Sequence, residues 1–226
     1  MQETNIKCLG FIMDGNRRWA REQGLETLEG HKRGHEVFQD CVRWVRDTDI
    51  EHTVFYAFST ENWQRKKNEV EYLMQLFEQV LKSLLEGVEE EKVRVRIIGR
   101  RSDFSPAIQG LMQEVEEKSV QYTGTTIWVA LSYGGRTEIV EAVNTAMKEG
   151  EKVTEESFSK LLWTTGMPDP DMIVRTSGEE RLSNFLPWQS VYSEFYFIKK
   201  HWPALTKDDF NDILKEYESR ERKRGV

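Results

Sequence analysis

Short apolar runs alternate with longer amphipathic stretches along most of the chain. Six runs have the length, the apolar or alternating character and the polar borders that are typical of β-strands. They cover residues 8–13, 53–58, 93–99, 125–133, 171–176 and 194–198. We therefore expect six strands that are separated, for the most part, by helices.

The clearest helical pattern covers residues 69–86, where Leu73, Phe77, Leu81 and other apolar residues recur every three or four positions. Further helices are predicted at 34–47, 106–121, 136–149, 155–163 and 207–222. The glutamate run at 89–91 is interpreted as a solvated turn between a helix and a strand.

Alternating strands and helices favour an α/β fold, with a central, mainly parallel six-stranded sheet flanked by helices. A chain of 226 residues suits one well-buried core, so we expect residues 1–226 to form a single domain. Ligands of such sheets gather at the carboxyl ends of the strands. The polar stretches that follow the strands are therefore the candidate site.

Four polar stretches follow predicted strands and are expected to converge on one rim of the sheet. They are residues 14–18, "STENWQR" at 59–65, "YGGR" at 133–136 and "RTSGEERLSN" at 175–184. The first contains an Asp-Gly-Asn turn, which allows the backbone to lie close to a ligand. A solvated turn followed by an amphipathic helix is an alternative explanation for the same residues.

Composition and charge narrow the class of protein. With 38% hydrophobic and 31% charged residues and a net charge of −7, the chain is typical of a soluble globular protein. The acidic balance argues against nucleic-acid binding, which needs a basic surface. The cations are clustered, however, so local anion sites remain open.

Cysteine usage and hydropathy point to the cytoplasm. Cys8 and Cys41 are the two cysteines, and their spacing indicates neither a disulfide framework nor a zinc site. The first ten residues lack the apolar core of a signal peptide, and no run approaches the ~18 apolar residues of a membrane span. We expect a cytoplasmic protein, with peripheral contact to a membrane surface left open.

Four arginines occupy similar positions after separate strands and would bring fixed positive charge to the rim. They are Arg18, Arg65, Arg175 and Arg181. The planar fork of arginine suits phosphate oxygens, and several arginines on one rim indicate more than one phosphate. The alternative is that each pairs with a carboxylate nearby in sequence, such as Glu61, Glu179 or Glu180.

Two acids, Asp14 and Glu194, lie at ends of predicted strands. Mg²⁺ usually binds proteins through one or two carboxylates together with phosphate oxygens. Glu194 by itself reads as a surface residue, and a metal role requires that it approach Asp14. His31 lies near the start of a helix, where free N–H groups favour anions, although a histidine in this position is more often structural.

The motifs, taken together, resemble the cis-prenyltransferases, or (Z)-prenyl diphosphate synthases, of which undecaprenyl diphosphate synthase is the best-known type. The similarity runs from about residue 9 to residue 225, in the family's order and spacing. Its motifs are "MDGNRRWA", "GHKRG", "YAFSTENWQR", "RIIG", "YGGR", "IVRTSGEERLSNFLPWQ" and "SEFYF".

The resemblance implies an Mg²⁺-dependent enzyme that extends an allylic diphosphate with isopentenyl diphosphate and forms cis double bonds. It also implies a mainly parallel sheet, an apolar tunnel for the growing chain and a homodimer. The apolar face of 69–86 would form one tunnel wall, although it reads equally well as core. That face consists of Val70, Leu73, Met74, Phe77 and Leu81, and the small Ala57 would lie on the second strand.

The resemblance also implies roles for individual residues. Asp14 would bind Mg²⁺ and assist departure of the allylic diphosphate, Asn62 would assist proton loss, and Glu194 would be the second metal-associated acid. The remaining matches are substrate-binding: Gly15, Asn16, Arg17, Arg18, Trp19, His31, Ser59, Trp63, Arg65, Arg175, Arg181 and Ser183.

Three positions depart from the usual pattern of the family. Arg17 stands where many members have glycine, Thr27 where many have arginine, and Lys223 where a C-terminal motif has arginine. These departures keep two alternatives open. One is an enzyme with altered primer or acceptor specificity, joining prenyl units other than head to tail. The other is a non-catalytic partner subunit of a heteromeric enzyme.

One further motif competes with this interpretation. "DDFND" at 208–212 has the DDxxD spacing of the all-helical trans-prenyl synthases. Thr206 and Asp209 also have the spacing of a helix-capping box, and acids are favoured in a first helical turn. Six predicted strands contradict an all-helical fold, so we interpret this motif as a helix start.

Overall fold

The computed structural model describes residues 2–150 and 152–220. Six strands form one sheet in the order β3-β4-β2-β1-β5-β6, and every neighbouring pair is parallel. The strands are β1 (Cys8–Ile12), β2 (His52–Ser59), β3 (Arg94–Ile98), β4 (Thr126–Tyr133), β5 (Met172–Arg175) and β6 (Glu194–Phe197). The six predicted strands are confirmed, and the sheet is parallel throughout.

Helices connect the strands. They are α1 (Asn16–Glu22), α2 (Thr27–Arg46), α3 (Lys67–Glu91), α4 (Pro106–Ser119), α5 (Gly135–Glu149), α6 (Glu155–Ser159) and α7 (Lys207–Ser219). Short 3₁₀ helices cover η1 (Thr60–Gln64), η2 (Arg101–Asp103) and η3 (Trp202–Ala204). None of the helices in the described ranges combines the length and the apolar character that crossing a bilayer requires.

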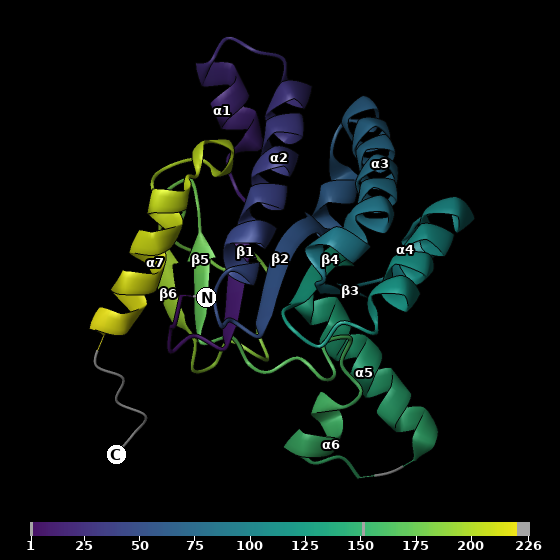
Figure 1. The fold of residues 1–226 in the computed structure, drawn as a ribbon. Helices are drawn as coiled ribbons and strands as arrows, with labels where there is room; N and C mark the ends of the chain where they lie inside the picture. Colours follow the sequence, from purple (N-terminus) through teal and green to yellow (C-terminus); the bar gives the residue numbers. More distant parts are fainter. Residues whose placement is uncertain (1, 151, 221–226) are drawn as a thin grey trace.

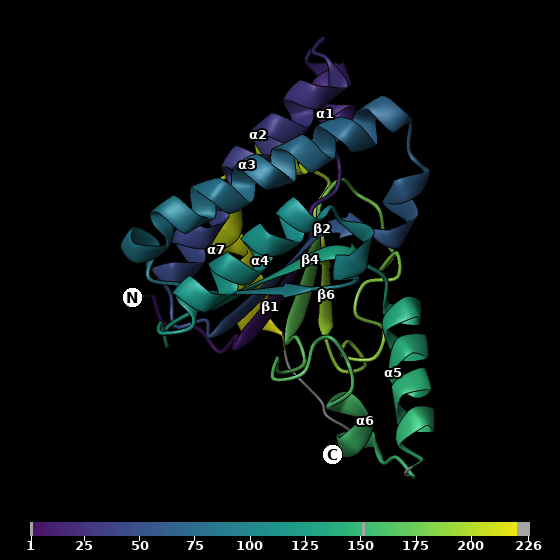
Figure 2. The ribbon, with the colours of Figure 1, turned by 90° about the vertical axis from the view of Figure 1, so that its right-hand side faces the viewer.

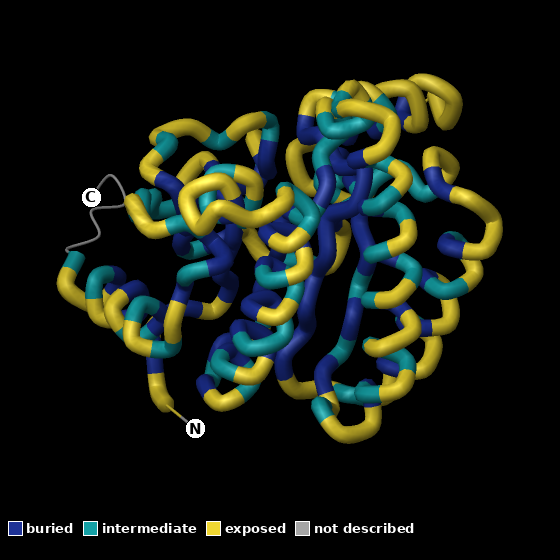
Figure 3. Tube along the Cα trace, turned by 90° about the horizontal axis from the view of Figure 1, so that it is seen from above, coloured by how far each residue is buried: buried dark blue, intermediate teal, exposed yellow. Residues whose placement is uncertain are grey.

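The helices cover both faces of the sheet. Figure 2 shows α2, α3, α4 and α7 on one side and α5 and α6 on the other. Because both faces are covered, the central strands are buried on both sides and read as continuous apolar runs. Every residue of β1 and β4 is buried, and the strands form the buried centre of the molecule (Figure 3).

Two of the predicted boundaries are wrong in an informative way. Helix α2 begins at Thr27, about two turns before the predicted start, because Gly30 and Gly34 do not interrupt it. Helix α3 extends to Glu91, so the glutamate run at 89–91 forms its last turn instead of a solvated loop. Glu91 accepts hydrogen bonds there from Arg43 (3.3 Å) and Arg46 (2.5 Å) of α2.

Strand order places the candidate site. From the central β1, the chain crosses to β2 on one side and later to β5 on the other, so the loops after these three strands surround one crevice. Figure 1 shows the chain passing from β1 into α1 at this carboxyl edge. The polar stretches at 14–18, 59–65 and 175–184 therefore meet, as predicted.

Candidate active site

The loop after β1 is fastened to the neighbouring strand β5. The backbone N–H of Asp14 donates to the hydroxyl of Thr176 at 3.0 Å, and this hydroxyl donates to the Asp14 carbonyl at 2.7 Å. Trp202 also donates its backbone N–H to the Asp14 carbonyl, at 3.0 Å. Three segments that are far apart in sequence thus determine the position of Asp14.

Glycines allow the loop and helix α2 to approach one another. Gly15 has a φ of 105°, and a Cβ atom there would lie 2.5 Å from the Ser177 hydroxyl oxygen. A Cβ at Gly30 would lie 2.1 Å from the Asn16 carbonyl oxygen, and one at Gly34 would lie 2.2 Å from Asn16 Oδ1. Real Cβ atoms do not approach other atoms this closely, so the glycines of "GHKRG" are needed for this contact.

Asn16 lies where the loop meets α2, and its side chain faces the site. Its Oδ1 atom is buried and has no hydrogen-bond partner among the described residues. Buried side-chain oxygens are rarely unpaired in native proteins. The Asn16 amide is therefore a candidate contact for a ligand.

Asp14 lies between two arginines. Its Oδ2 atom is 2.9 Å from Nη2 of Arg175 and 3.1 Å from Nη2 of Arg18. Partial burial disfavours the charged carboxylate, but the hydrogen bond and charge of Arg175, together with Arg18, lower the pKa of Asp14 below its usual value. Asp14 is thus a carboxylate at neutral pH.

Arg175 connects Asp14 to the segment after β5. Its side chain is 95% buried, and Nη1 donates to the Ser183 hydroxyl at 2.8 Å and to the Arg181 carbonyl. Arg175 and Ser183, two of the predicted substrate-binding residues, are therefore joined directly. The Nε atom of Arg175 is buried and has no protein partner in the described ranges.

The "YGGR" motif holds the segment that contains Ser183 and Asn184. The backbone N–H groups of Gly135 and Arg136 donate to the carbonyl and Oδ1 of Asn184, at 2.8 and 2.9 Å. Asn184 also donates from Nδ2 to Glu61 at 3.0 Å. Ser183 and Asn184 both have positive φ, an uncommon conformation for residues other than glycine. Asn184, which the sequence did not single out, thus holds a strained segment in place.

The rim arginines pair with carboxylates, as the alternative interpretation proposed. Glu179 contacts Nη1 of Arg18 at 2.8 Å and also contacts Arg181. Arg65 contacts Glu69 at 3.0 Å. These contacts do not displace the guanidinium groups from the rim, because Arg18, Arg65 and Arg181 line the same polar hollow as Asp14.

Glu69 is a central residue that sequence reasoning missed. It is buried, and its carboxylate lies 3.4 Å from Nε2 of His31, 3.0 Å from Arg65 and 3.7 Å from Arg17. Burial, with the charge of Arg65, lowers the pKa of His31 to about 4, so its imidazole is neutral at pH 7. The four-residue spacing of Arg65 and Glu69 in sequence was the available signal.

The predicted residues of η1 divide into two groups. Ser59 and Asn62 form a reciprocal cap for this turn, in which the Ser59 N–H donates to Asn62 Oδ1 at 3.1 Å, and both residues line a polar hollow. Trp63 instead donates its indole N–H to Ser132 at 2.8 Å and packs against Phe58. Neither Trp63 nor Trp19 lines the two polar hollows that contain Asp14, and their predicted substrate contacts stay predictions.

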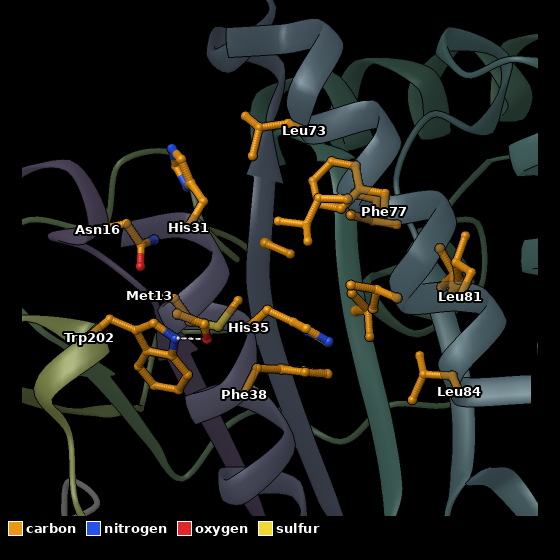
Figure 4. A pocket seen from close by; sticks show the side chains of 17 residues that line it. Met13, Asn16, His31, His35, Phe38, Leu73, Phe77, Leu81, Leu84 and Trp202 are labelled. Carbon is orange, nitrogen blue, oxygen red and sulfur yellow. Dashed lines mark hydrogen bonds between the residues drawn. The ribbon is translucent and has the colours of Figure 1, made fainter. Parts of the chain in front are cut away.

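The polar hollows open onto an apolar cavity. A hollow of about 360 Å³ contains Asp14 and Arg18, and an adjoining one of about 530 Å³ contains Arg175 and Ser183. The apolar cavity measures about 100 Å³ and shares Met13, Asn16 and His31 with both hollows. In Figure 4, Asn16 and His31 lie near the entrance of this cavity. The site is therefore polar at one end and apolar at the other.

The expected apolar wall is confirmed in part. Leu73, Phe77 and Leu81 of α3 line the cavity together with Leu76, Val80 and Leu84, whereas Val70 and Met74 do not (Figure 4). Ala57 lines it from β2, at a break in the register between Tyr56 and Phe58. Ala57 lies on the same face of the strand as Phe55, and the break turns Phe58 toward this face as well.

Glu194 lies away from Asp14. It begins β6 and pairs in register with Met172 at the start of β5, whereas Asp14 follows β1 at the opposite edge of the sheet. Glu194 contacts Arg220 at 2.9 Å. Within the described chain, the expected approach of Glu194 to Asp14 is therefore not found, and the Lys223 departure lies outside the described residues.

A rim of arginines lies beside an apolar cavity, so the site is cationic at one end and apolar at the other. The profile of the family described as "Putative undecaprenyl diphosphate synthase" matches residues 12–225. The isoprenyl transferase of Thermotoga maritima is 47% identical over 222 residues, which cover 96% of this chain and 95% of that protein. The chain therefore belongs to the undecaprenyl diphosphate synthase family and is a prenyltransferase.

Solved structures agree with this assignment. Lavandulyl diphosphate synthase from Lavandula x intermedia, in complex with dimethylallyl diphosphate, superposes with a TM-score of 0.93 at 32% identity, covering 98% of both chains. A "probable undecaprenyl diphosphate synthase" from Campylobacter jejuni has a TM-score of 0.84 at 33% identity, covering 98% of this chain and 99% of that one. The α/β fold predicted from sequence is thus the fold of these enzymes.

Proposed function

We propose that the enzyme transfers the prenyl group of an allylic diphosphate to isopentenyl diphosphate in an Mg²⁺-dependent reaction that forms a cis-polyprenyl diphosphate. The observation that carries the proposal is the direct opening of the arginine-lined hollow onto the apolar cavity at Met13, Asn16 and His31. A charged head group and a hydrocarbon tail can bind side by side there.

The two substrates are assigned to the two polar hollows. The loop with Asn16 and Arg18 would hold the allylic diphosphate, whose hydrocarbon chain enters the cavity. Arg175, Arg181 and Ser183 would hold isopentenyl diphosphate. Phosphate oxygens would replace Glu179 as the partner of Arg18 and Arg181, because a diphosphate carries more charge than one carboxylate and suits the arginine fork.

Mg²⁺ fits beside Asp14. Both arginine contacts of Asp14 involve Oδ2, which leaves Oδ1 to face a cation. No cluster of three or more His, Cys, Asp or Glu side chains in the described ranges could hold an ion without further ligands. An ion at Asp14 would therefore take its other ligands from diphosphate and water, as Mg²⁺ usually does. When bound, it supplies positive charge that stabilises the departing diphosphate.

The surrounding residues align the substrates and exclude water. Isopentenyl diphosphate attacks through a weak π nucleophile, so alignment by Arg175, Ser183 and the Asn62 turn supplies much of the acceleration. Neutral His31 would act as a hydrogen-bond donor to a phosphate and not as a charge. The apolar cavity excludes the water that would otherwise capture a developing carbocation.

The decisive assay is the incorporation of labelled isopentenyl diphosphate by the purified protein, with C5, C10, C15 and C20 allylic primers. We expect cis-polyprenyl products that require Mg²⁺ and that disappear in Asp14→Ala. NMR reads the double-bond geometry and chromatography the length. Activity of the purified chain would also exclude a purely supporting role in a heteromer. Trans products, or full activity in EDTA, would contradict the proposal.

The structural likeness to lavandulyl diphosphate synthase favours a second candidate, an acceptor other than isopentenyl diphosphate. Thr27 begins α2 and lines a polar hollow together with Arg17 and Arg65, so a departure from the family pattern lies at the site itself. Dimethylallyl diphosphate as the sole substrate tests this candidate. A coupled product in that reaction, with none in the first assay, would support it.

A further inference from the structure

The short helix α1 carries Arg17 and Arg18 at the rim of the site, but little apolar packing holds it. It spans seven residues, fewer than an isolated helix needs to be stable in water. Within the described chain, Ala20 is the one residue of α1 that is buried, and no side chain caps the start of the helix. In Figure 1, α1 lies beside the segment that precedes α7. Contacts with that segment therefore help to determine where the two arginines lie.

One imidazole of this segment contacts both ends of α1. His201, which directly precedes η3, lies against Gly15 at the start of the helix, where an added Cβ atom would be 2.6 Å from Nδ1 and 3.0 Å from Cβ of the histidine. At the other end, Nε2 of His201 is 3.0 Å from the carboxylate of Glu22, the last residue of α1. A single side chain is thus in contact with both ends of the helix.

The other imidazole nitrogen of His201 bonds to Ser177. Its Nδ1 atom and the Ser177 hydroxyl are hydrogen-bonded. Glu22, as a carboxylate, can only accept, so Nε2 carries the hydrogen of a neutral imidazole and Nδ1 accepts from the serine hydroxyl. The three side chains therefore form one chain of hydrogen bonds, the α1 brace, which runs from Ser177 through His201 to Glu22.

Ser177 connects the brace to the rim. Its carbonyl accepts from Nη1 of Arg18 at 3.4 Å, and its N–H donates to the Lys200 carbonyl at 2.9 Å. Its φ of 82° is uncommon for a residue other than glycine. Such a conformation persists where the surrounding contacts determine it. The hydroxyl and the carbonyl of one fixed residue therefore hold His201 and Arg18 together.

A serine, a histidine and an acid in this order also occur in nucleophilic catalysis, but packing excludes that role for Ser177. Its hydroxyl lies against Gly15, where an added Cβ atom would be 2.5 Å away. Ser177 is buried and lines neither of the two polar hollows that contain Asp14. A reacting carbon or phosphorus atom has no space beside this hydroxyl, so the arrangement positions other groups.

We propose that the α1 brace fixes Arg17 and Arg18 in the position that binds the allylic diphosphate. The inference rests on the proposed function, which assigns the loop with Arg18 to that substrate. The three members of the brace lie behind the loop and do not touch the reacting atoms, so they are positioning residues. Because α1 carries no member of the group assigned to isopentenyl diphosphate, the brace should affect the affinity for the allylic substrate alone.

Substitutions of Glu22 test the brace with little risk to folding, because this side chain is 56% exposed. Glu22→Ala removes the acceptor and should raise the KM for the allylic diphosphate roughly three- to tenfold, the effect of one hydrogen bond. The KM for isopentenyl diphosphate should keep its wild-type value. Glu22→Gln is the conservative variant. Its amide oxygen can still accept from Nε2 of His201, so both KM values should match the wild type.

His201→Asn tests the same contact from the other side. Asparagine can accept near the position of Nδ1 but is too short to reach Glu22. It should raise the same KM, and adding Glu22→Ala should raise it no further, because both changes break one contact. His52→Asn is the matched control. Nδ1 of His52 also accepts a hydrogen bond, from Trp128 at 3.1 Å, but His52 begins β2 at the edge of the sheet opposite the site. This control should keep both KM values.

Three kinetic results would overturn the brace. They are an unchanged allylic KM in Glu22→Ala and His201→Asn, an equal rise in both KM values, and a Glu22→Gln variant as impaired as Glu22→Ala. A wild-type protein that makes no product would contradict the proposed function instead.

Hydrogen–deuterium exchange tests the brace without turnover. The amides of residues 16–22 should exchange faster in Glu22→Ala than in the wild type or in Glu22→Gln, because the helix opens more often when its last residue is released. Equal exchange in all three proteins would show that the brace does not hold α1 and would overturn the proposal, whichever substrates the enzyme uses.

Discussion

Single residues determine the shape of the diphosphate end of the site. Gly15 adopts a left-handed conformation with Ser177 directly against it, and Gly30 and Gly34 remove side chains where α2 meets Asn16. The buried guanidinium of Arg175 is balanced by the carboxylate of Asp14, 2.9 Å away. Backbone approach and charge pairing together define the shape of the hollow in which the proposed diphosphate would bind.

Gly15→Ala should damage both stability and binding. The new Cβ would lie 2.5 Å from Ser177 Oγ and 2.6 Å from His201 Nδ1, in a backbone conformation that alanine disfavours. We expect a loss of about 1–3 kcal/mol in the free energy of unfolding and a raised KM for the allylic diphosphate. Urea denaturation and steady-state kinetics measure the two effects.

Gly24→Ala is the control for this substitution. Gly24 also has a positive φ, of 69°, but an added Cβ meets no described atom within 4 Å. It should lose stability through backbone strain alone and keep the wild-type KM. Equal KM values for the two variants would show that the close contact at Gly15 does not shape the site.

His31→Gln should weaken the pH dependence of stability. The pKa of His31 is about 4 in the folded protein, mainly because of burial, against about 6.5 in an unfolded chain. Between these values the unfolded chain binds a proton that the folded protein does not. Stability should therefore fall as the pH drops through this window, by roughly 3 kcal/mol at most from this residue.

Urea midpoints at about pH 7.5 and pH 4.5 test this expectation. Glutamine does not titrate, so the difference between the two midpoints should be smaller in His31→Gln than in the wild type. Above pH 7 the side chain at position 31 is neutral in both proteins. The difference between their urea midpoints there therefore measures the cost of the substitution itself. If stability depends on pH to the same extent in His31→Gln and in the wild type, protonation of His31 is not the cause of that dependence.

At the scale of elements, hydrophobic periodicity predicted the helices and strands but not the details of where they end or become irregular. The apolar face of α3 was recognisable in sequence, but its last turn depends on Glu91 contacting Arg43 and Arg46 of α2. Phe58 packs on the same face of β2 as Phe55 and Ala57 because the strand departs from regular register there. Both features depend on a neighbouring element, so local pattern could not reveal them.

Helix capping explains the "DDFND" motif. The Thr206 hydroxyl accepts from the Asp209 N–H at 3.3 Å, and Asp209 Oδ2 accepts from the Thr206 N–H at 2.7 Å, which confirms the predicted capping box. Thr206→Ala should lower the free energy of unfolding by about 1 kcal/mol. It should leave prenyl transfer and the proposed dependence on Mg²⁺ unchanged.

Asp212→Asn is the companion variant, because it removes the last acid of the motif without touching the cap. Mg²⁺ titration of activity should match the wild type in both variants. A raised Mg²⁺ requirement in Asp212→Asn would revive a metal-binding role for the motif, and an unchanged free energy of unfolding in Thr206→Ala would weaken the capping explanation.

At the scale of the whole molecule, one surface of α5 is unusually apolar. Val140, Val143 and Met147 share a face of this helix and are 57%, 42% and 74% exposed. We propose that a second copy of the chain covers this face, since the family resemblance implies a homodimer and α5 also supports the Asn184 segment of the site.

Met147→Glu should weaken this association, because a second copy would have to bury a charge. Sedimentation equilibrium should move the mass from twice 26.6 kDa toward the value of one chain. Val120→Glu, which introduces the same charge at an exposed position beyond α4, should keep the wild-type mass. A wild-type protein that sediments as one chain would contradict the homodimer.

The sequence by itself determined the strands, the fold class, the polar rim and the family, because these follow from local periodicity and from motifs that are continuous in the chain. Only the tertiary structure decided which charged groups meet. Glu69, 38 residues from His31, became a central partner. Glu194 was placed at the opposite edge from Asp14, because strand register and not sequence fixes that separation.

The apolar cavity was likewise decided by packing. Apolar residues of α3 read equally well as core or as tunnel wall, since periodicity defines a face but not what lies against it. The three-dimensional arrangement leaves space between α2 and α3, with Phe38 and Leu84 dividing it. Volume between elements is a property of their packing, so no local pattern in the chain could have predicted it.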